Sequence, residues 1–163
     1  MHRVFSGLCY KRKHKTFSNF SLKDERDVGY LDSIQNTDMI RSLYIKDFAL
    51  IDELEVEFGP GLNILTGQTG AGKSIIIGAL NMILGERADT EVIRQGSTKA
   101  IAEATIAHNN DPALLSALQQ HDIEQHSPII LRREIRENGS RAFINDSPVT
   151  IGVLKSIGDL LVD

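Results

Sequence analysis

Eight consecutive residues carry the clearest chemical signal in this sequence. They match the phosphate-binding pattern G-x-x-x-x-G-K-[ST] and are Gly67, Gln68, Thr69, Gly70, Ala71, Gly72, Lys73 and Ser74. Glycines let the main chain adopt positive φ and approach an anion, and N–H groups at the positive end of a helix then face the phosphates. Lys73 is placed to reach the β- and γ-phosphates, and the Ser74 hydroxyl is a ligand for Mg²⁺. The spacing therefore predicts a nucleoside triphosphate site with Mg²⁺.

The flanking segments agree with this interpretation, because such a loop must join a strand to a helix. Residues 61–66 form a short apolar run behind a Gly-Pro-Gly turn, which predicts a buried strand. Residues 74–84 are long and apolar enough for a packed helix, and Gly85 suits its C-terminal end. Strand, loop and helix occur in the required order, which argues against a chance glycine-rich turn.

Alternating apolar residues predict a sheet around this unit. Half-buried strands are expected over 40–48, 51–58 and 99–108. Asn138-Gly139 lies between two more strand-like runs, 129–137 and 140–145, and predicts a hairpin.

Two further helices are expected. Asp111 as N-cap and Pro112 in the first turn predict a helix that ends near Gln120. Thr150 predicts a second helix to about Ile157, followed by a strand over 158–163.

Bulk properties narrow the class of protein. The chain has 163 residues, is 41% hydrophobic and 25% charged, and contains no Trp, which is typical of one globular domain. No apolar run approaches the roughly 18 residues that span a bilayer. The single cysteine, Cys9, has no internal partner, so a reducing compartment is expected.

Charge is distributed unevenly. Residues 1–23 hold six Lys or Arg and no acid, whereas residues 24–163 hold twelve basic and 22 acidic residues, a net charge of −10. The body therefore lacks the overall basic character of a nucleic-acid-binding domain. Residues 1–38 are expected to be a basic, unstructured extension. They are compatible with a transit peptide, a nucleic-acid-binding arm or, as we favour, an extension that adds nothing to the fold.

The order of these motifs resembles a known family. Residues 40–58, the run Gly61-Leu62-Asn63-Ile64-Leu65-Thr66-Gly67 and the phosphate loop resemble the opening of the SMC/RecF group of ATPase heads. Within that group the sequence is most similar to the RecN family of bacterial DNA-repair ATPases. The segments that carry this likeness are 67–77, Leu84 to Thr90, Ile93 to Gly96, Leu131 to Arg133, Ser140 to Asn145 and Pro148 to Thr150.

The resemblance implies a fold and a function. It implies an α/β fold, the N-terminal half of an ABC/SMC-type P-loop ATPase head, with a mixed sheet, antiparallel strands and a P-loop helix. It covers residues 39–163, with truncation before the Q-loop, and none of 1–38. The expected cofactors are ATP and Mg²⁺, and the expected function is ATP binding in the recombinational repair of DNA double-strand breaks. The expected location is the cytoplasm, at the nucleoid. Import into an organelle, directed by residues 1–38, stays open. No membrane partner is expected.

The resemblance also implies parts that this sequence lacks. Family members need a Q-loop, a signature motif, a Walker B Asp with a catalytic Glu and a switch His, and no segment here supplies them. We therefore expect a fragment that binds nucleotide weakly and does not turn it over. Its expected partners are the missing C-terminal half of the head, a second head and, through the full-length protein, DNA. Departures such as Gln68 for Glu and Gly78 for Asp remove no phosphate contact.

Two alternatives remain at this stage. In one, Leu160, Leu161 and Val162 form a Walker B strand with Asp163 on Mg²⁺, and the chain is a complete small P-loop NTPase or kinase. A GTPase is disfavoured, because Thr98-Lys99-Ala100-Ile101 lacks the Asp of T/N-K-x-D. In the other, the chain is an inactive truncated remnant.

Other polar clusters are weaker candidates. Arg132, Arg133, Arg136 and Arg141 surround the hairpin and suit either a phosphate or DNA contact or, as we favour, a solvated face balanced by Glu134 and Glu137. His121 and His126 lack an accompanying Cys, so a polar loop is favoured over a metal site. Arg94 is compatible with a position near the nucleotide, but nothing assigns it there.

Overall fold

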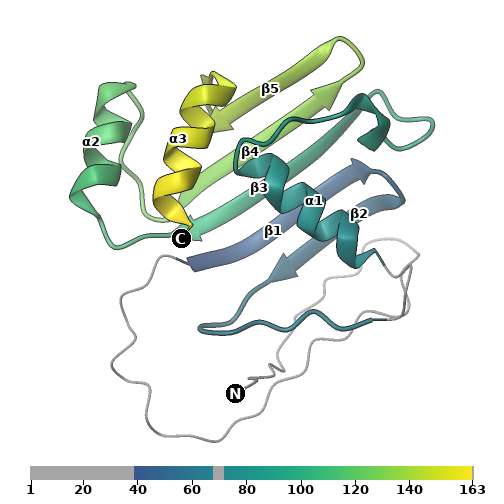
Figure 1. The fold of residues 1–163 in the computed structure, drawn as a ribbon, viewed down its shortest axis with the longest axis horizontal. Coiled ribbons are helices and arrows are strands. Elements are labelled where there is room, and N and C mark those ends of the chain that lie inside the picture. Colours follow the sequence, from purple (N-terminus) through teal and green to yellow (C-terminus); the bar gives the residue numbers. More distant parts are fainter. Residues whose placement is uncertain (1–38, 68–71, 163) are drawn as a thin grey trace, which may run out of the picture.

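Figure 1 shows a computed structural model of the chain, which describes residues 39–67 and 72–162. In chain order these residues form β1 (Met39–Phe48), β2 (Ile51–Glu57), α1 (Lys73–Ile83), the 3-10 turn η1 (Thr90–Val92), β3 (Lys99–Ala107), α2 (Pro112–Gln120), β4 (Ile129–Arg136), β5 (Gly139–Ile144), β6 (Ser147–Val149) and α3 (Ile151–Leu161). The proposed extension over 1–38 lies outside the described residues.

The strands form one six-stranded sheet in the order β2-β1-β3-β4-β5-β6. Every neighbouring pair is antiparallel, with Leu43 beside Ala104 and Ala104 beside Leu131 in the register of the three central strands. The Asn-Gly hairpin is formed as predicted, with Gly139 at φ 125° and opposite Arg136. The α/β class, the antiparallel strands and the P-loop helix are thereby confirmed.

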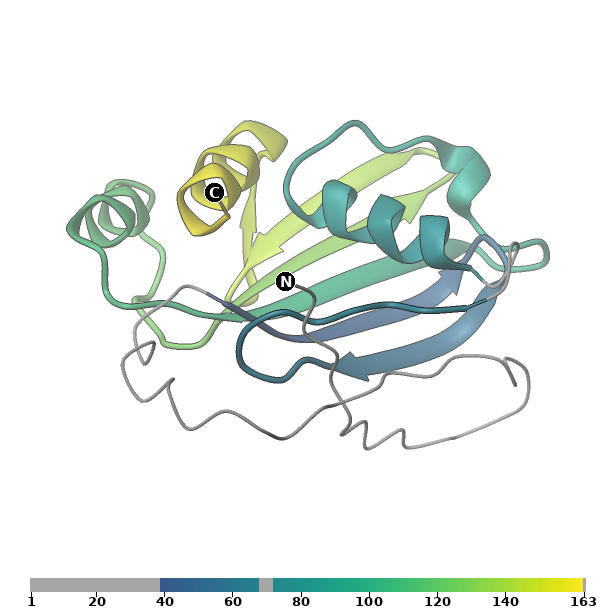
Figure 2. The same ribbon diagram turned by 60° about the horizontal axis from the view of Figure 1, so that its bottom comes forward.

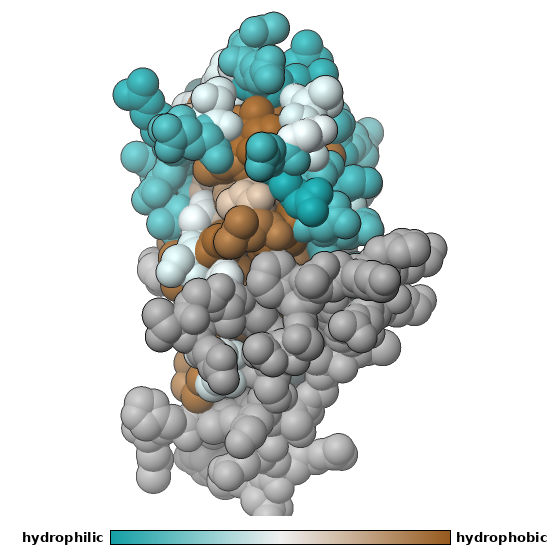
Figure 3. Space-filling view, turned by 90° about the vertical axis from the view of Figure 1, so that its right-hand side faces the viewer, coloured by the Kyte–Doolittle hydropathy of each residue, from teal (hydrophilic) through white to brown (hydrophobic). Residues whose placement is uncertain are grey.

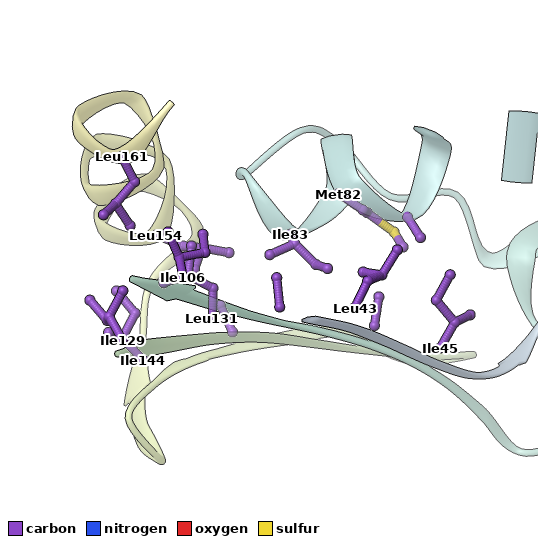
Figure 4. Packing of buried hydrophobic residues seen from close by; sticks show 14 of the residues in the cluster. Leu43, Ile45, Met82, Ile83, Ile106, Ile129, Leu131, Ile144, Leu154 and Leu161 are labelled. Carbon is purple, nitrogen blue, oxygen red and sulfur yellow. The ribbon is translucent and has the colours of Figure 1, made fainter. Parts of the chain in front are cut away.

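Figure 2 shows that α1 and α3 lie on the same face of the curved sheet. Helix α1 buries Ile76, Ala79, Met82 and Ile83 at helical spacing, and α3 buries Leu154, Ile157 and Leu161. Figure 4 shows Met82 above Leu43, Ile83 between Leu43 and Leu131 on the same side of the sheet, and Leu154 near Ile106. This two-layer core fixes the start of α1 relative to the sheet.

A close junction joins the end of α1 to α3. The N–H groups of Gly85 and Glu86 donate to the carbonyls of Met82 and Asn81, which is a Schellman motif with Gly85 at φ 95°. A Cβ built on Gly85 would lie 2.7 Å from the Cα of Lys155. Glycine is required there both for its conformation and for space. The predicted helix end is confirmed.

The two edges of the sheet have different protection. At one edge, β2 exposes Asp52, Glu53, Glu55 and Glu57. At the other edge, β6 has three residues, and the middle one is Pro148.

Two sequence predictions are wrong. Residues 62–65 form no strand, only Thr66 makes an isolated bridge, and Leu62 is 46% exposed. An apolar run becomes a strand only where another strand pairs with it, and no described strand lies beside this run in the sheet order.

The second error concerns the end of the chain. Helix α3 continues to Leu161, so the strand expected over 158–163 is absent and the helix does not end at Ile157. Its buried residues follow the helical period, and Gly158 packs against the main chain of Leu84. The alternative of a Walker B strand is therefore wrong; Asp163 itself lies outside the described residues.

Candidate phosphate-binding site

The two ends of the glycine loop lie within the described residues. Gly67 follows the bridge at Thr66, and Gly72 is the N-cap of α1 with φ 87°. A Cβ at Gly72 would meet nothing within 4 Å, so the left-handed backbone, not crowding, favours glycine there. Gln68, Thr69, Gly70 and Ala71, which the sequence assigns to the same loop, lie outside the described residues.

Lys73 joins the two ends of the loop. It is the first residue of α1, and its ammonium donates a hydrogen bond to the carbonyl oxygen of Gly67. The ammonium of Lys73, at the start of α1, is therefore tied to Gly67 at the other end of the loop.

The N-terminus of α1 is suited to an anion. No side chain caps it, and its first turn contains no acidic residue. An uncapped helix start carries a partial positive charge through its N–H groups. Ser74 follows Lys73 and is exposed, so its hydroxyl is accessible beside the loop.

A pocket of about 400 Å³ adjoins Ser74. Its walls come from one face of α1, the β1–β2 turn and the connection after α1; the lining residues are Phe48, Ala49, Ser74, Ile75, Gly78, Asn81, Met82, Glu86, Arg87, Ala88, Asp89 and Val92. Figure 3 faces the side that carries the β1–β2 turn and η1, and apolar surface lies there between hydrophilic residues. The volume of this open pocket lies within the range of small-molecule sites.

Main-chain contacts hold the pocket's outer wall. The N–H of Ala49 donates to the carbonyl of Val92 (2.6 Å), and the N–H of Arg94 donates to the carbonyl of Asp47 (2.9 Å). The β1–β2 turn is therefore tied to the connection after α1. Sequence reasoning missed this wall, because the contacts join segments more than 40 residues apart, and no local pattern signals them.

Arg94 is not among the residues that line the pocket. Its guanidinium lies 3.4 Å from the carboxylate of Asp52, and both side chains are partly exposed. The structure therefore places Arg94 in an ion pair on the β1–β2 side of the molecule.

The arginines around the hairpin do not form one solvated face. Arg132 lies 3.0 Å from Asp146 and 3.6 Å from Glu103, and stacks 4.6 Å from the centre of the Phe143 ring. Arg136 pairs with Glu134 at 2.8 Å.

Arg133, however, is completely buried, so the solvated interpretation is wrong for it. The signal was present in the sequence, because residues 129, 131, 133 and 135 share one face of β4.

The described residues contain no group of three or more His, Cys, Asp or Glu side chains that could hold a metal ion. His126 instead lies 2.7 Å from the carboxylate of Glu124, and His121 is the C-cap of α2. Both histidines therefore lie at the end of α2 and in the connection that follows it. No helix in the described part of the chain is long and apolar enough to cross a bilayer.

The sequence of this chain is similar to a known protein family and to several characterised proteins. The family model described as an AAA domain matches residues 42–151. The DNA repair protein RecN of Xylella fastidiosa is 44% identical over 130 residues, and that of Bacillus subtilis 41% over 127 residues; both matches cover 77% of this chain. The chain spans only about 23% and 22% of the length of these relatives.

Solved structures agree on the fold. An SMC head domain from Pyrococcus furiosus covers 74% of this chain with a TM-score of 0.61 and 20% identity, and the match covers 32% of that chain. The recombination mediator RecF with ATP covers 77% of this chain with a TM-score of 0.55 and 15% identity, and the match covers 31% of that chain.

Proposed function

Because the chain belongs to the AAA domain family and is 40–44% identical to RecN proteins over 77% of its length, we propose that it is the ATP-binding segment of a RecN-like protein. The process we propose for it is recombinational repair of damaged DNA, including double-strand breaks, in the cytoplasm at the nucleoid. The observation that carries the proposal is the position of Lys73 across the loop at an uncapped helix start.

The described residues fit ATP and Mg²⁺. The start of α1 at Gly72 and Lys73 would hold the β- and γ-phosphates through its N–H groups, with Gly72 supplying the left-handed turn. Lys73 then exchanges the carbonyl of Gly67 for phosphate oxygens, a stronger charge-assisted pairing. The hydroxyl of Ser74 would be the protein ligand of Mg²⁺, and the ion would offset the negative charge of the phosphates.

The pocket beside Ser74 takes the base and ribose in this proposal. Its apolar walls, among them Phe48, Met82 and Val92, suit a planar ring better than a charged group. Its position next to Ser74 allows one nucleotide to reach both the pocket and the phosphate loop.

Binding and turnover are separable in this proposal. Hydrolysis of ATP requires groups that orient water and stabilise developing charge. We propose that these come from the remainder of the head and from a second head, and that DNA acts through the full-length protein. The chain alone then binds ATP and does not hydrolyse it.

Titration of the purified chain with fluorescently labelled ATP, with and without Mg²⁺, tests the proposal. Removing the Lys73 ammonium leaves phosphate charge unpaired, so Lys73→Ala is expected to weaken binding at least about 10-fold. Ser74→Ala is expected to abolish the gain in affinity that Mg²⁺ gives the unchanged chain. Lys46→Ala, at an exposed position on β1, serves as the matched control and is expected to bind normally.

Equal affinity of Lys73→Ala and the unchanged chain would remove the basis of the proposed site. A phosphate-release assay addresses turnover separately. Phosphate release by the chain that Lys73→Ala abolishes would show that the segment is a competent ATPase by itself.

A further inference from the structure

Arg133 is a buried cation with few partners. Its side chain has no exposed surface, although it is among the largest side chains in the core. One nitrogen, Nη2, donates to the hydroxyl of Ser140 at 3.1 Å. The other two, Nε and Nη1, are buried and have no acceptor in the described structure. Burial lowers the pKa of this guanidinium, as expected where water is excluded and no anion compensates.

The register of the sheet explains why no acid is close. Arg133 stands between Ala102 and Ala142 on the neighbouring strands. It shares the buried face of β4 with Leu131, which Figure 4 shows on the side of the sheet that the helices cover. Leu131 and Ile135 flank it along β4, and both are buried. Glu134 follows directly in the strand, so its side chain lies on the opposite face and pairs there with Arg136.

Such an arrangement is unfavourable by itself. A buried charge without a counter-ion costs far more than its hydrogen bonds return, and buried arginines in proteins are normally paired. A carboxylate satisfies this requirement, because it neutralises the charge and accepts from the free N–H groups. Among the described residues, no carboxylate accepts a hydrogen bond from Nε or Nη1 of Arg133, and burial is the only cause of its lowered pKa.

We propose that Arg133 is the receptor for an Asp or Glu carboxylate on a polypeptide segment that this chain does not contain, the remainder of a RecN-type protein. The chain spans about 23% of the length of its RecN relatives, so most of such a protein is available to supply the acid. The two flanking residues on the neighbouring strands are alanines, which offer the guanidinium no polar side chain. This inference does not rest on the nucleotide site.

The test compares one substitution in two settings, because the proposal predicts opposite signs. In the chain alone, Arg133→Met removes an uncompensated charge and keeps most of the volume. It is expected to raise the urea midpoint by about 1 M. In a chimera where this chain replaces the matching part of the Xylella fastidiosa RecN, the same change leaves a buried carboxylate without its partner. There it is expected to lower the midpoint by about 1 M or more.

Pulse proteolysis in urea reports both midpoints on the same scale. Arg141→Met, at an exposed position on β5, is the control and is expected to move either midpoint by less than about 0.3 M. The Arg133→Met chimera could also fail to fold at all. This result supports the proposal if the Arg133→Met chain and the Arg141→Met chimera both fold.

A shift of the same sign in both settings, or no shift in the chimera, overturns the proposal. A loss of stability in the chain alone would place the acceptor within this chain itself.

Discussion

Replacing Gly85 by alanine tests how tightly the end of α1 is fixed against α3. Gly85 has φ 95°, a conformation that costs an alanine about 1–2 kcal/mol. An added Cβ would also lie 2.6 Å from the Cβ and 2.7 Å from the Cα of Lys155, well inside contact distance. Main-chain atoms cannot rotate away, so α3 must move, and overpacking of this kind costs about 1–3 kcal/mol. The expected loss of stability is therefore about 2–5 kcal/mol.

The same helix offers a matched control. Gly78 lies within α1, and a Cβ there would meet nothing within 4 Å. Gly78→Ala removes only the entropic penalty of glycine in a helix and is expected to raise stability by up to about 1 kcal/mol. The two glycine-to-alanine changes should thus have opposite signs.

Urea unfolding followed by circular dichroism, without nucleotide, measures both free energies of unfolding. The strain and overpacking argument would be refuted by a Gly85→Ala variant within about 1 kcal/mol of the unchanged chain. It would also fail if Gly78→Ala lost as much stability as Gly85→Ala, since the surroundings would then not decide the outcome.

Three further changes test single contacts. Burial and then a hydrogen bond to the carboxylate of Glu53 raise the pKa of Tyr44 to about 12 from its ordinary value of 10.0, so the folded form resists ionisation. The contribution of Tyr44 to stability should be constant below about pH 10 and be lost between pH 10 and 12. The urea midpoints of Tyr44→Phe across that window should therefore fall less steeply than those of the unchanged chain. Thr150→Ala removes the side-chain N-cap of α3 and should cost about 1 kcal/mol by urea unfolding, whereas Thr150→Ser should cost almost nothing. Arg132→Lys loses the planar stack on Phe143 and one of two ion pairs, and should lower the free energy of unfolding in urea by about 1 kcal/mol. As a control, Arg136→Lys at the exposed end of β4 should change this free energy little.

Local signals in the sequence predicted those elements whose cause is local. The Asn138-Gly139 hairpin, the cap at Asp111 and the Gly85 helix end depend on a few adjacent residues, and the structure has all three. The start of α1 with Lys73 follows from the phosphate-loop pattern.

Elements that depend on distant partners were predicted poorly. Residues 62–66 have the composition of a strand but no described strand beside them. The end of α3 depends on packing of Gly158 against Leu84, which is far away in the sequence. The burial of Arg133 follows from its register in β4, but its charge suggested a solvated position.

The same distinction holds for the candidate site. The phosphate loop is visible as a contiguous motif, whereas the pocket wall forms from the β1–β2 turn and the connection after α1. Ala49 contacts Val92 through main-chain atoms, which leave no trace in side-chain composition.

The two rims of the sheet limit how this protein can assemble. A foreign strand that approached β2 would meet a row of carboxylates, and one that approached β6 would find a ladder of three residues interrupted by a proline that has no N–H. Growth by strand addition is therefore blocked on both flanks of the described sheet. Association at either of these two edges must then rely on side-chain contacts and not on a continuous backbone ladder.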